Sequence, residues 1–525
     1  MRFGPAVDSL VGAFFPKSEL ERKLYRIKLE KLEKLKNRSE TYAAARSNRM
    51  TGTWSPGNTD INSIIKASSQ SVRGRVRQLV RDFPYFANAV NRLVDYTVGP
   101  GIIYQSKIQN ADGTLNKKLI QQIEDAFNFW ADEADVAKKL HYYEIMQLSK
   151  RQDIESGEYI IVKRHRPNEN RYLPYVLQVY ESDWLTSEND KGLGEAISGI
   201  QRGELYNIDQ GVEYNRLTGE VKYYHFTDPD GWGKSVRIPA KDVIHGYQAL
   251  RPGQRRGISP FTPGILLAND FGDYFNATVD VAKMSAKYLA FVKSPNPESR
   301  QLDLSTETNA DDDTRYIDDM ENAIIEYLNP GEEIDIASNP NPGNQVTPFT
   351  RLIVTMLSIT TGVPYELLSG DYSGMNFSTG RMARSDFKYA LKPISTRHIR
   401  NFCNPTFRAF LDSATLYGKL TLPGFFTDPY PYFKCEWQPP GMDSIDPLRE
   451  AKADIDAVKS NLKSPQEIIR ARGRDPEEIL KEIKQWNDWK DDYEIIDMEE
   501  ISTAMANNPA AIDKEPTNGK KTIKK

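Results

Sequence analysis

Residues 370–387 read GDYSGMNFSTGRMARSDF, a stretch of glycines and hydroxyl side chains that runs into a predicted helix. These residue types fit a phosphate-binding loop, a serine nucleophile or a structural loop that lines a pore. The helix carries a basic stripe at spacings i, i+3, i+7 and i+11, formed by Arg381, Arg384, Lys388 and Lys392. Such cations suit phosphate contacts, ion pairs between subunits or a solvated face, and the sequence leaves these interpretations open.

A second candidate is GWGKS at 231–235, which resembles the end of a nucleotide-binding loop. That loop requires a glycine five positions before Gly233, where this chain has Asp228, and no helix is predicted to follow. No GxSxG elbow surrounds Ser373 or Ser378. The five histidines show no paired metal-ligand spacing: His141, His165, His225, His245 and His398. We therefore predict no catalytic, cofactor or metal site, and a nucleotide-dependent enzyme remains the alternative.

The charge balance restricts the class of partner. The chain has 525 residues, with 69 Lys and Arg against 73 Asp and Glu, for a net charge of -4. Tight DNA binding is driven by counterion release and favours a basic protein, so this balance argues against a sequence-specific DNA binder but allows a protein that DNA passes. Two cysteines exclude a disulfide framework. With neither a signal peptide nor a long apolar run, we expect a soluble, intracellular, multidomain protein without a membrane span.

The elements that position these residues follow from periodicity and capping signals. Apolar faces predict helices from Asp60 to Gly99 with a break at Phe83-Pro84, and over 116–134, 264–294, 346–363 and 378–416. The last is expected to kink at Pro393 and Pro405. The 264–294 helix carries an acidic stripe, which faces a pore or is simply solvated, formed by Asp270, Asp273 and Asp280.

The remaining segments are mixed. Short alternating runs between about 140 and 260 predict strands, and Asn329-Pro330-Gly331 predicts a hairpin turn. Three helices with proline-containing start signals are predicted between 446 and 490. The charged helix at 17–37 is predicted to be a surface arm or a partner-facing helix, and the end of the chain to be disordered. The fold class is α+β.

Five segments, in this order and spacing, resemble the lambda-type portal proteins of tailed bacteriophages: RDFPYFANAVNRLVDYTVGPGI (81–102), RPGQRRGISPF (251–261), IEYLNPGEEIDIASNPNPG (325–343), TTGVPYELLSGDYSGMNFSTGRMAR (360–384) and EWQPPGMDSIDPLREAKAD (436–454). The resemblance spans roughly residues 60 to 490. The family form near 376–381 is closer to N-Y-S-S-A-R, so Phe377, Thr379 and Gly380 are departures, and Gly380 weakens the helix start.

The resemblance implies a portal-type fold assembled as a cyclic ring, probably the twelve-subunit connector of a phage head, without catalytic activity. Its implied parts are an N-terminal arm and linker (1–59), a mixed α/β wing (60–263), stem helix 1 (264–290), a clip with a β-hairpin (291–345), stem helix 2 (346–363), a tunnel loop (364–377), a second wing part with the long kinked helix (378–440), a helical crown (441–495) and a disordered tail (496–525).

The resemblance also implies a function. Double-stranded DNA would be packaged and ejected through the ring at one capsid vertex, and the ring would assemble in the host cytoplasm. The implied partners are further copies of the chain, the terminase large subunit, major capsid and scaffold proteins, and head-completion or tail adaptor proteins. The loop residues expected to face the channel are Tyr372, Ser373, Gly374, Met375 and Asn376. A non-ring adaptor protein is the further alternative.

Overall fold

The computed structural model describes these residues: 24–25, 27–28, 57–110, 112–167, 169–188, 190, 206–227, 235–287, 291–293, 333–335, 346–441, 447–472, 474 and 476–493. The chain divides into two compact units, residues 1–63 and 64–525. Of the first unit, the described part is helical at 24–25 and 27–28 and at the start of α3. The predicted arm at 17–37 otherwise lies outside the described residues, as do the linker up to 56 and the tail from 494.

Two helices open the larger part of the fold, α3 (Ile61–Asp82) and α4 (Pro84–Thr97). The predicted break is confirmed: Phe83 is extended, with φ of -117° and ψ of 111°, and Pro84 occupies the first turn of α4, where its missing N–H costs nothing. Helix α5 (Lys117–Ala131) begins at Asn116, whose side chain accepts a hydrogen bond from the Leu119 N–H.

One helix was missed. The region from 140 onward was expected to contain strands only, but α6 (Tyr142–Glu155) precedes them. Its start is a capping box, in which the His141 ring accepts from the Tyr143 N–H and the Glu144 carboxylate accepts from the His141 N–H at 2.7 Å. Histidine is an unusual residue at this position, so the usual Ser, Thr, Asp or Asn signal was absent.

The strands between residues 158 and 247 form two antiparallel sheets. The first has the order β3-β2-β8, from β2 (Glu158–His165), β3 (Tyr175–Tyr180) and β8 (Val243–Tyr247). The second has the order β4-β5-β6-β7, from β4 (Tyr206–Asp209), β5 (Val212–Asn215), β6 (Val221–Phe226) and β7 (Val236–Pro239). Ile160 pairs with Tyr180 on one side and with His245 on the other, which places β2 at the centre of the first sheet. The strand prediction for this region is thus confirmed.

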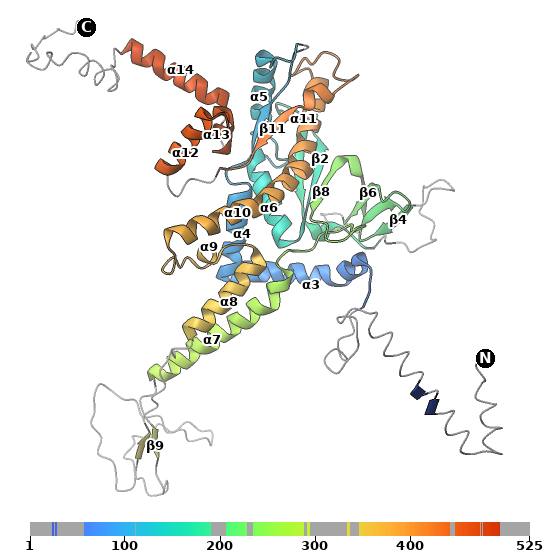
Figure 1. The fold of residues 1–525 in the computed structure, drawn as a ribbon. Helices are drawn as coiled ribbons and strands as arrows, with labels where there is room; N and C mark the ends of the chain where they lie inside the picture. Colours follow the sequence, from blue (N-terminus) through green and yellow to red (C-terminus); the bar gives the residue numbers. More distant parts are fainter. Residues whose placement is uncertain are drawn as a thin grey trace, which may run out of the picture. The chain divides into compact units, whose positions relative to one another are not determined.

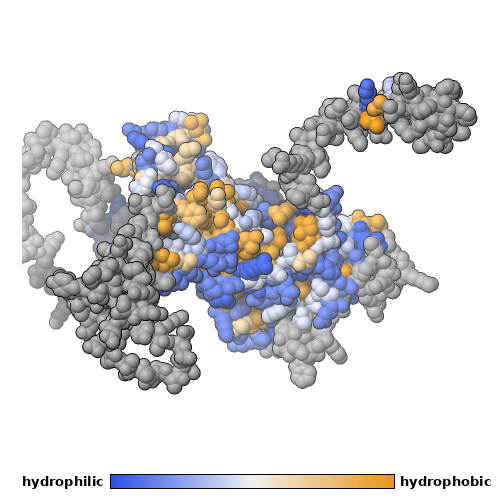
Figure 2. All heavy atoms as spheres, turned by 90° about the horizontal axis from the view of Figure 1, so that it is seen from below, coloured by the Kyte–Doolittle hydropathy of each residue, from blue (hydrophilic) through white to orange (hydrophobic). Residues whose placement is uncertain are grey.

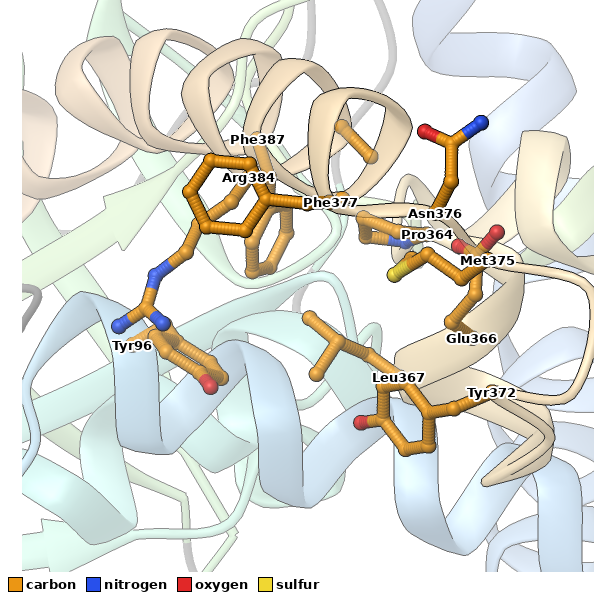
Figure 3. Close-up of a pocket in the computed structure, with 12 residues that line it drawn as sticks. Tyr96, Pro364, Glu366, Leu367, Tyr372, Met375, Asn376, Phe377, Arg384 and Phe387 are labelled. Atoms are coloured by element: carbon orange, nitrogen blue, oxygen red, sulfur yellow. The ribbon is translucent and has the colours of Figure 1, made fainter. Parts of the chain in front are cut away.

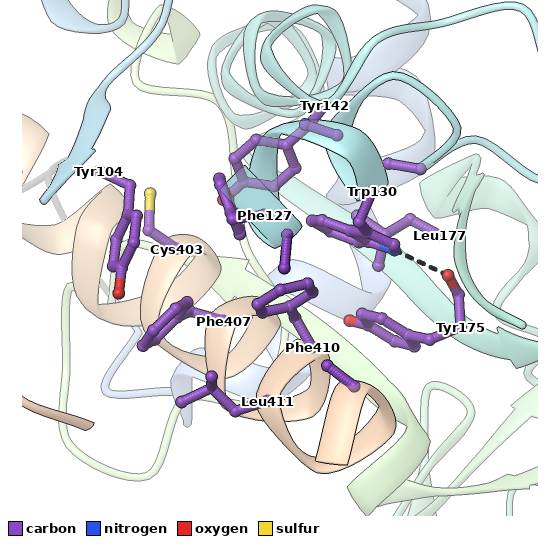
Figure 4. Packing of buried hydrophobic residues seen from close by; sticks show 14 of the residues in the cluster. Tyr104, Phe127, Trp130, Tyr142, Tyr175, Leu177, Cys403, Phe407, Phe410 and Leu411 are labelled. Carbon is purple, nitrogen blue, oxygen red and sulfur yellow. Dashed lines mark hydrogen bonds between the residues drawn. The ribbon is translucent and has the colours of Figure 1, made fainter. Parts of the chain in front are cut away.

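A third pairing joins distant parts of the chain. Strand β1 (Ile103–Ser106) pairs antiparallel with β11 (Cys435–Gln438), with Tyr104 opposite Trp437. The largest core cluster closes over this pair, and aromatic rings dominate it (Figure 4). Trp130 stacks on Tyr175 with an interplanar angle of 9° and donates its indole N–H to the Tyr175 carbonyl at 2.8 Å. Residues before 180 and after 400 therefore share one hydrophobic core.

Helices α7 (Ile265–Lys287) and α8 (Val346–Thr361) lie side by side (Figure 1), and their rings Tyr274 and Phe349 are 4.9 Å apart. The predicted helix at 264–294 is too long: residues 291–293 form β9 (Phe291–Lys293), which pairs antiparallel with β10 (Glu333–Asp335). The predicted turn at 329–331 lies outside the described residues.

The long C-terminal helix of the prediction is interrupted. Helix α10 (Phe377–His398) contains Pro393, continues as a π-helical segment at Ile399–Cys403, and gives way to α11 (Asn404–Leu416). Pro405 lies in the first turn of α11 and has no N–H to donate. The wider turn of the π-helical segment before it accommodates this missing hydrogen bond. The three predicted terminal helices are confirmed as α12 (Pro447–Lys459), α13 (Pro465–Ala471) and α14 (Pro476–Asp492).

Candidate functional site

The loop at 370–376 connects a short helix to α10. The segment 364–377 was predicted to be a loop throughout, but α9 (Tyr365–Ser369) occupies part of it. Gly370 ends α9 in the left-handed conformation, with φ of 73°, and donates its N–H to the Glu366 carbonyl. The conformational freedom of glycine is required at this position, because a side chain at such a φ is strained.

Hydrogen bonds within the loop fix its course. The Asp371 carboxylate accepts from the Ser373 N–H at 3.0 Å and from the Ser373 hydroxyl at 2.6 Å, which forms an Asx turn. These bonds lower the pKa of Asp371. The Asn376 side chain then caps α10 by accepting from the Thr379 N–H and hydroxyl, both at 2.8 Å. The turn and the cap hold both ends of the loop.

A pocket of about 400 Å³ lies beneath the start of α10 (Figure 3). Its wall is mainly apolar and includes Tyr96 of α4, Leu367 of α9 and Phe387 of α10. Figure 3 shows Arg384 directed toward Tyr96 at one end and Met375 close to Glu366 at the other. Residues of the loop, α9, α4 and the start of α10 thus line the same pocket.

The structure supplies a reason for Gly380, which departs from the family pattern. A Cβ atom added at this position would lie 2.8 Å from the Met375 sulfur, so the loop packs against the bare backbone of α10. The lower helix propensity of glycine is the cost of this close approach. Tyr372 is 54% exposed, and Ser373, Gly374 and Asn376 are exposed as well.

The basic stripe lies on one surface of α10. Arg381, Lys388 and Lys392 are exposed and Arg384 is half-buried, and none of the four forms an ion pair with another described residue. Lys392 instead lies over the ring of Tyr389, 4.9 Å from its centroid. On another face of the same helical segment, Phe387, Leu391, His398 and Phe402 are buried and Ile394 is half-buried. The exposure of the cations fits the predicted stripe, and their role stays a prediction.

The acidic residues of α7 are also exposed. Asp270 has no ion pair within the described part of the chain, Asp273 accepts from the Asn269 amide at 3.3 Å, and Asp280 pairs with Lys283 at 3.0 Å. The cations of α10 do not pair with these acids in the same chain. Whether the stripe faces a channel stays a prediction.

Little among the described residues supports the enzyme alternatives. GWGKS falls outside them at 231–234, and no group of His, Cys, Asp and Glu among them has the arrangement of a metal site. Four histidines have structural partners: His225 contacts Glu213, His245 contacts Glu158, His398 contacts Ser149 and His141 caps α6. None of the helices that the structure describes is long and apolar enough to span a bilayer.

Sequence reasoning missed a buried group of charges around Glu158, the first residue of β2. Glu158 is fully buried and accepts from Arg256 through both oxygens, with Nε distances of 2.9 and 3.0 Å. It also contacts His245 at 3.1 Å and accepts from the Gly257 N–H at 2.8 Å. Burial alone would raise the pKa of Glu158, but the charge of Arg256 and the hydrogen bonds from His245 and Arg256 hold the pKa well below its usual value.

This cluster explains one of the motifs. Arg256 and Gly257 belong to RPGQRRGISPF (251–261), and a Cβ at Gly257 would lie 2.0 Å from the Gly157 carbonyl oxygen. Arg73 of α3 lies 3.6 Å from Glu158 and donates to Asp183 at 2.9 Å. The only signal in the sequence was the motif itself, because the charge partners are separated by up to 183 residues, as the numbers 73 and 256 show.

Comparison with known proteins identifies the family of this chain. The model of the phage portal protein family, lambda type, matches residues 47–392. A probable portal protein of Halomonas phage phiHAP-1 is 24% identical over 85% of this chain and 86% of its own length. Portal protein B of Escherichia phage lambda is 20% identical, over 81% and 85% respectively. A chain in the virion of a native gene transfer agent particle is 13% identical with a TM-score of 0.43, over 79% and 99%.

The matched range contains α3 to α9 and most of α10, including the loop at 370–376. The family model, which matches more than half of the chain, places it among phage portal proteins. More narrowly, it belongs to the lambda family of portal proteins.

Proposed function

We propose that copies of this chain form a closed ring of about twelve subunits at one vertex of a phage head, and that double-stranded DNA passes through its centre. The family match over residues 47–392 carries this proposal. In the ring, α7 and α8 are the stem, the segment around β9 and β10 is the clip, and α10 is the long wing helix. Helices α12 to α14 are the crown, and residues 370–376 are the tunnel loop.

The surface of α7 and α8 supports assembly. Large apolar side chains are exposed on both helices, including Phe275, Leu352, Met356 and Ile359, the last being 78% exposed. Apolar patches are also visible on the face shown in Figure 2. A monomer gains nothing from exposing such side chains, whereas neighbouring copies would bury them. The unpaired cations of α10 fit ion pairs with carboxylates of the next copy, such as Asp270 and Asp273.

The loop composition supports passage of DNA. Between Gly370 and Phe377 the one charged side chain is Asp371, whose carboxylate accepts hydrogen bonds from the N–H and the hydroxyl of Ser373. A channel through which DNA slides must not hold phosphate tightly, and a neutral polar surface meets this requirement better than a basic groove. The ring would have no catalytic activity; the terminase large subunit would supply energy at the clip, together with head-completion or tail proteins. Capsid and scaffold proteins would contact the wing.

The first test is the mass of the purified protein in solution with particle images. Twelve copies of 59.8 kDa weigh about 718 kDa. A ring near this mass with an axial hole is the expected result. A chain that stays monomeric in the presence of its scaffold protein would overturn the proposal.

The second test changes the loop charge without removing the cap. Asn376→Asp keeps the oxygen that accepts from Thr379, but it adds one negative charge to each copy beside the DNA path. We expect rings to form normally and packaged DNA per particle to fall. Asn376→Ser, a neutral residue that also caps helices well, is the matched control and should package normally. Full packaging by Asn376→Asp would contradict the assignment of this loop to the channel.

A further inference from the structure

A second cavity, of about 130 Å³, lies apart from the loop between α6, α10, the end of α8 and the segment that follows β8. Its apolar wall includes Leu93, Ile258 and Leu391. Its polar wall is formed by Lys150 and Asp153 of α6 and by Arg397 of α10. The cavity is far larger than the roughly 10–15 Å³ that one water molecule requires.

The charges on this wall do not balance. The Lys150 ammonium donates to Asp153 Oδ2 at 2.6 Å, and these side chains are only 4% and 8% exposed. Arg397 lies 3.8 Å from the same oxygen and is 23% exposed. Two cations therefore share one carboxylate oxygen.

Both cations retain free donor capacity. An ammonium has three N–H donors and a guanidinium has five. Within the described part of the chain, the Lys150 side chain donates to no acceptor other than Asp153, and the Arg397 side chain makes no hydrogen bond. Buried charges are normally paired and hydrogen-bonded, because removal from water is costly. The wall thus has one surplus positive charge, and the residues that carry the unused donors line the cavity.

The pKa of the neighbouring His398 reflects the positive charges of Lys150 and Arg397. Burial, and then the charges of Lys150 and Arg397, hold the pKa of His398 well below its usual value, so this histidine stays neutral. It adds no charge to the cavity wall, and its Nε2 lies 3.4 Å from the Ser149 hydroxyl. Asp153 is thus the one acid among the residues that line the cavity.

We propose that this cavity is a binding site for a carboxylate. A carboxylate placed between Lys150 and Arg397 would give the guanidinium a planar partner and the ammonium a second acceptor. The volume admits a carboxylate with a short carbon stem but no nucleic acid backbone with its sugars. The group can come from a free small acid or from an acidic side chain of a neighbouring copy.

Occupation would connect the wing helix to the stem. Thr361 and Gly362, at the end of α8, line the cavity opposite α6, and α10 supplies Phe387 to Arg397. A ligand held by Lys150 and Arg397 would fix α6 against α10 where both meet the end of α8. The site would therefore stabilise the junction of three elements rather than act on a reacting group.

Thermal unfolding of isolated subunits in sodium acetate tests the site, with sodium chloride of equal ionic strength as the reference. Acetate should raise the unfolding midpoint by an amount on the order of a few °C that saturates with concentration. Arg397→Gln should lose the increase while it keeps the Lys150–Asp153 pair. Arg400→Gln is the matched control, because Arg400 is exposed and donates only to the adjacent Asn401. It should retain the increase.

A second variant tests the cavity by its shape. Ala390 lines the cavity and is exposed at its edge, so Ala390→Phe should block entry without loss of folding and should also abolish the acetate effect. An equal rise in wild type, Arg397→Gln and Ala390→Phe would mean a general salt effect and a cavity that holds water only, which would overturn the proposal.

The source of the carboxylate follows from repeating the titration on assembled rings. An acetate effect that persists in rings would identify a free acid as the ligand. An effect that is present in subunits and absent in rings would identify an acidic side chain of the neighbour. Since the first titration uses isolated subunits, failure of ring assembly would leave the test of the site intact.

Discussion

Replacement of Arg256 by methionine should be among the most damaging single changes near the β3-β2-β8 sheet. The side chain donates to both oxygens of Glu158, to the Gln210 carbonyl at 2.9 Å and to the Ser182 carbonyl at 2.9 Å. Methionine fills similar space but leaves a buried carboxylate without its main partner. Removal of one member of a buried ion pair costs about 3–5 kcal/mol in free energy of unfolding.

Two further variants isolate the cause. Arg474 pairs with Glu482 at 2.8 Å, but both side chains are 52% exposed, so Arg474→Met should cost only about 0–1 kcal/mol. The double variant Arg256→Met with Glu158→Leu removes both charges, and it should recover part of the loss because an apolar pair needs no solvation. Arg73 and His245 remain near the site and limit the recovery.

The assay combines urea unfolding with hydrogen exchange of the amides in β2 and β8. We expect Arg256→Met to lower the unfolding midpoint and to increase exchange first in these two strands. If Arg256→Met cost no more than Arg474→Met, or if the double variant were less stable than the single one, the buried carboxylate would not be the source of the effect.

Three other changes have defined outcomes. Gly257→Ala should destabilise the protein, because the added Cβ would meet the Gly157 carbonyl. Gly74→Ala in α3 should instead stabilise it by up to about 1 kcal/mol, because a Cβ there meets nothing within 4 Å. The midpoints of urea unfolding compare the two variants. Asn376→Ala should cost about 0.5–2 kcal/mol of stability of α10, measured by hydrogen exchange in its first turn, and Asn376→Asp should restore most of it. Acidification should remove the stability that Glu158 contributes. Its pKa is lower in the folded state than the ordinary value of 4.5 in the unfolded state, so the ionised carboxylate stabilises the fold at pH values above 4.5. This stabilisation is lost as the pH falls from 4.5 through the folded-state pKa. Glu158→Gln should flatten the acid side of a plot of unfolding free energy against pH, and an unchanged slope would contradict the assigned pKa.

Local signals in the sequence were sufficient for much of the fold. Pro84 located the break between α3 and α4, and Asn116 located the start of α5 within one residue. The run EYIIVKRH coincides with β2, although its first five residues are all buried instead of alternating. Each of these features depends on residues within a few positions of one another, which is the range over which periodicity and capping operate.

Most of the errors arose where distant residues decide the structure, and one arose at an unusual helix cap. Residues 291–293 continue an apolar helical pattern, yet they form β9 because β10 supplies a partner strand. Helix α6 starts at a histidine cap, which is outside the usual set of capping residues. The pairing of β1 with β11 has no local signal, since alternation predicts a strand but not its partner.

The candidate site was predictable in position but incompletely in geometry. The glycines and Asn376 identified the loop, and the spacing from Arg381 to Lys392 identified the stripe. The short helix α9 and the contact of Met375 with Gly380 depend on packing, so neither follows from composition. The charges around Glu158 come from three separate segments and become a group only after folding.

The pairing of β1 with β11 determines when the largest core cluster can finish folding. During synthesis, Tyr104, Phe127 and Trp130 leave the ribosome long before Phe407 and Trp437, which complete their core. Residues 265–361, which contain α7 and α8, are made in the interval. Contacts of such large sequence separation form slowly, and the waiting apolar surface favours aggregation. The nascent chain must therefore keep an aromatic half-core exposed until β11 is made, and subunits competent for assembly exist only after almost the whole chain has been translated.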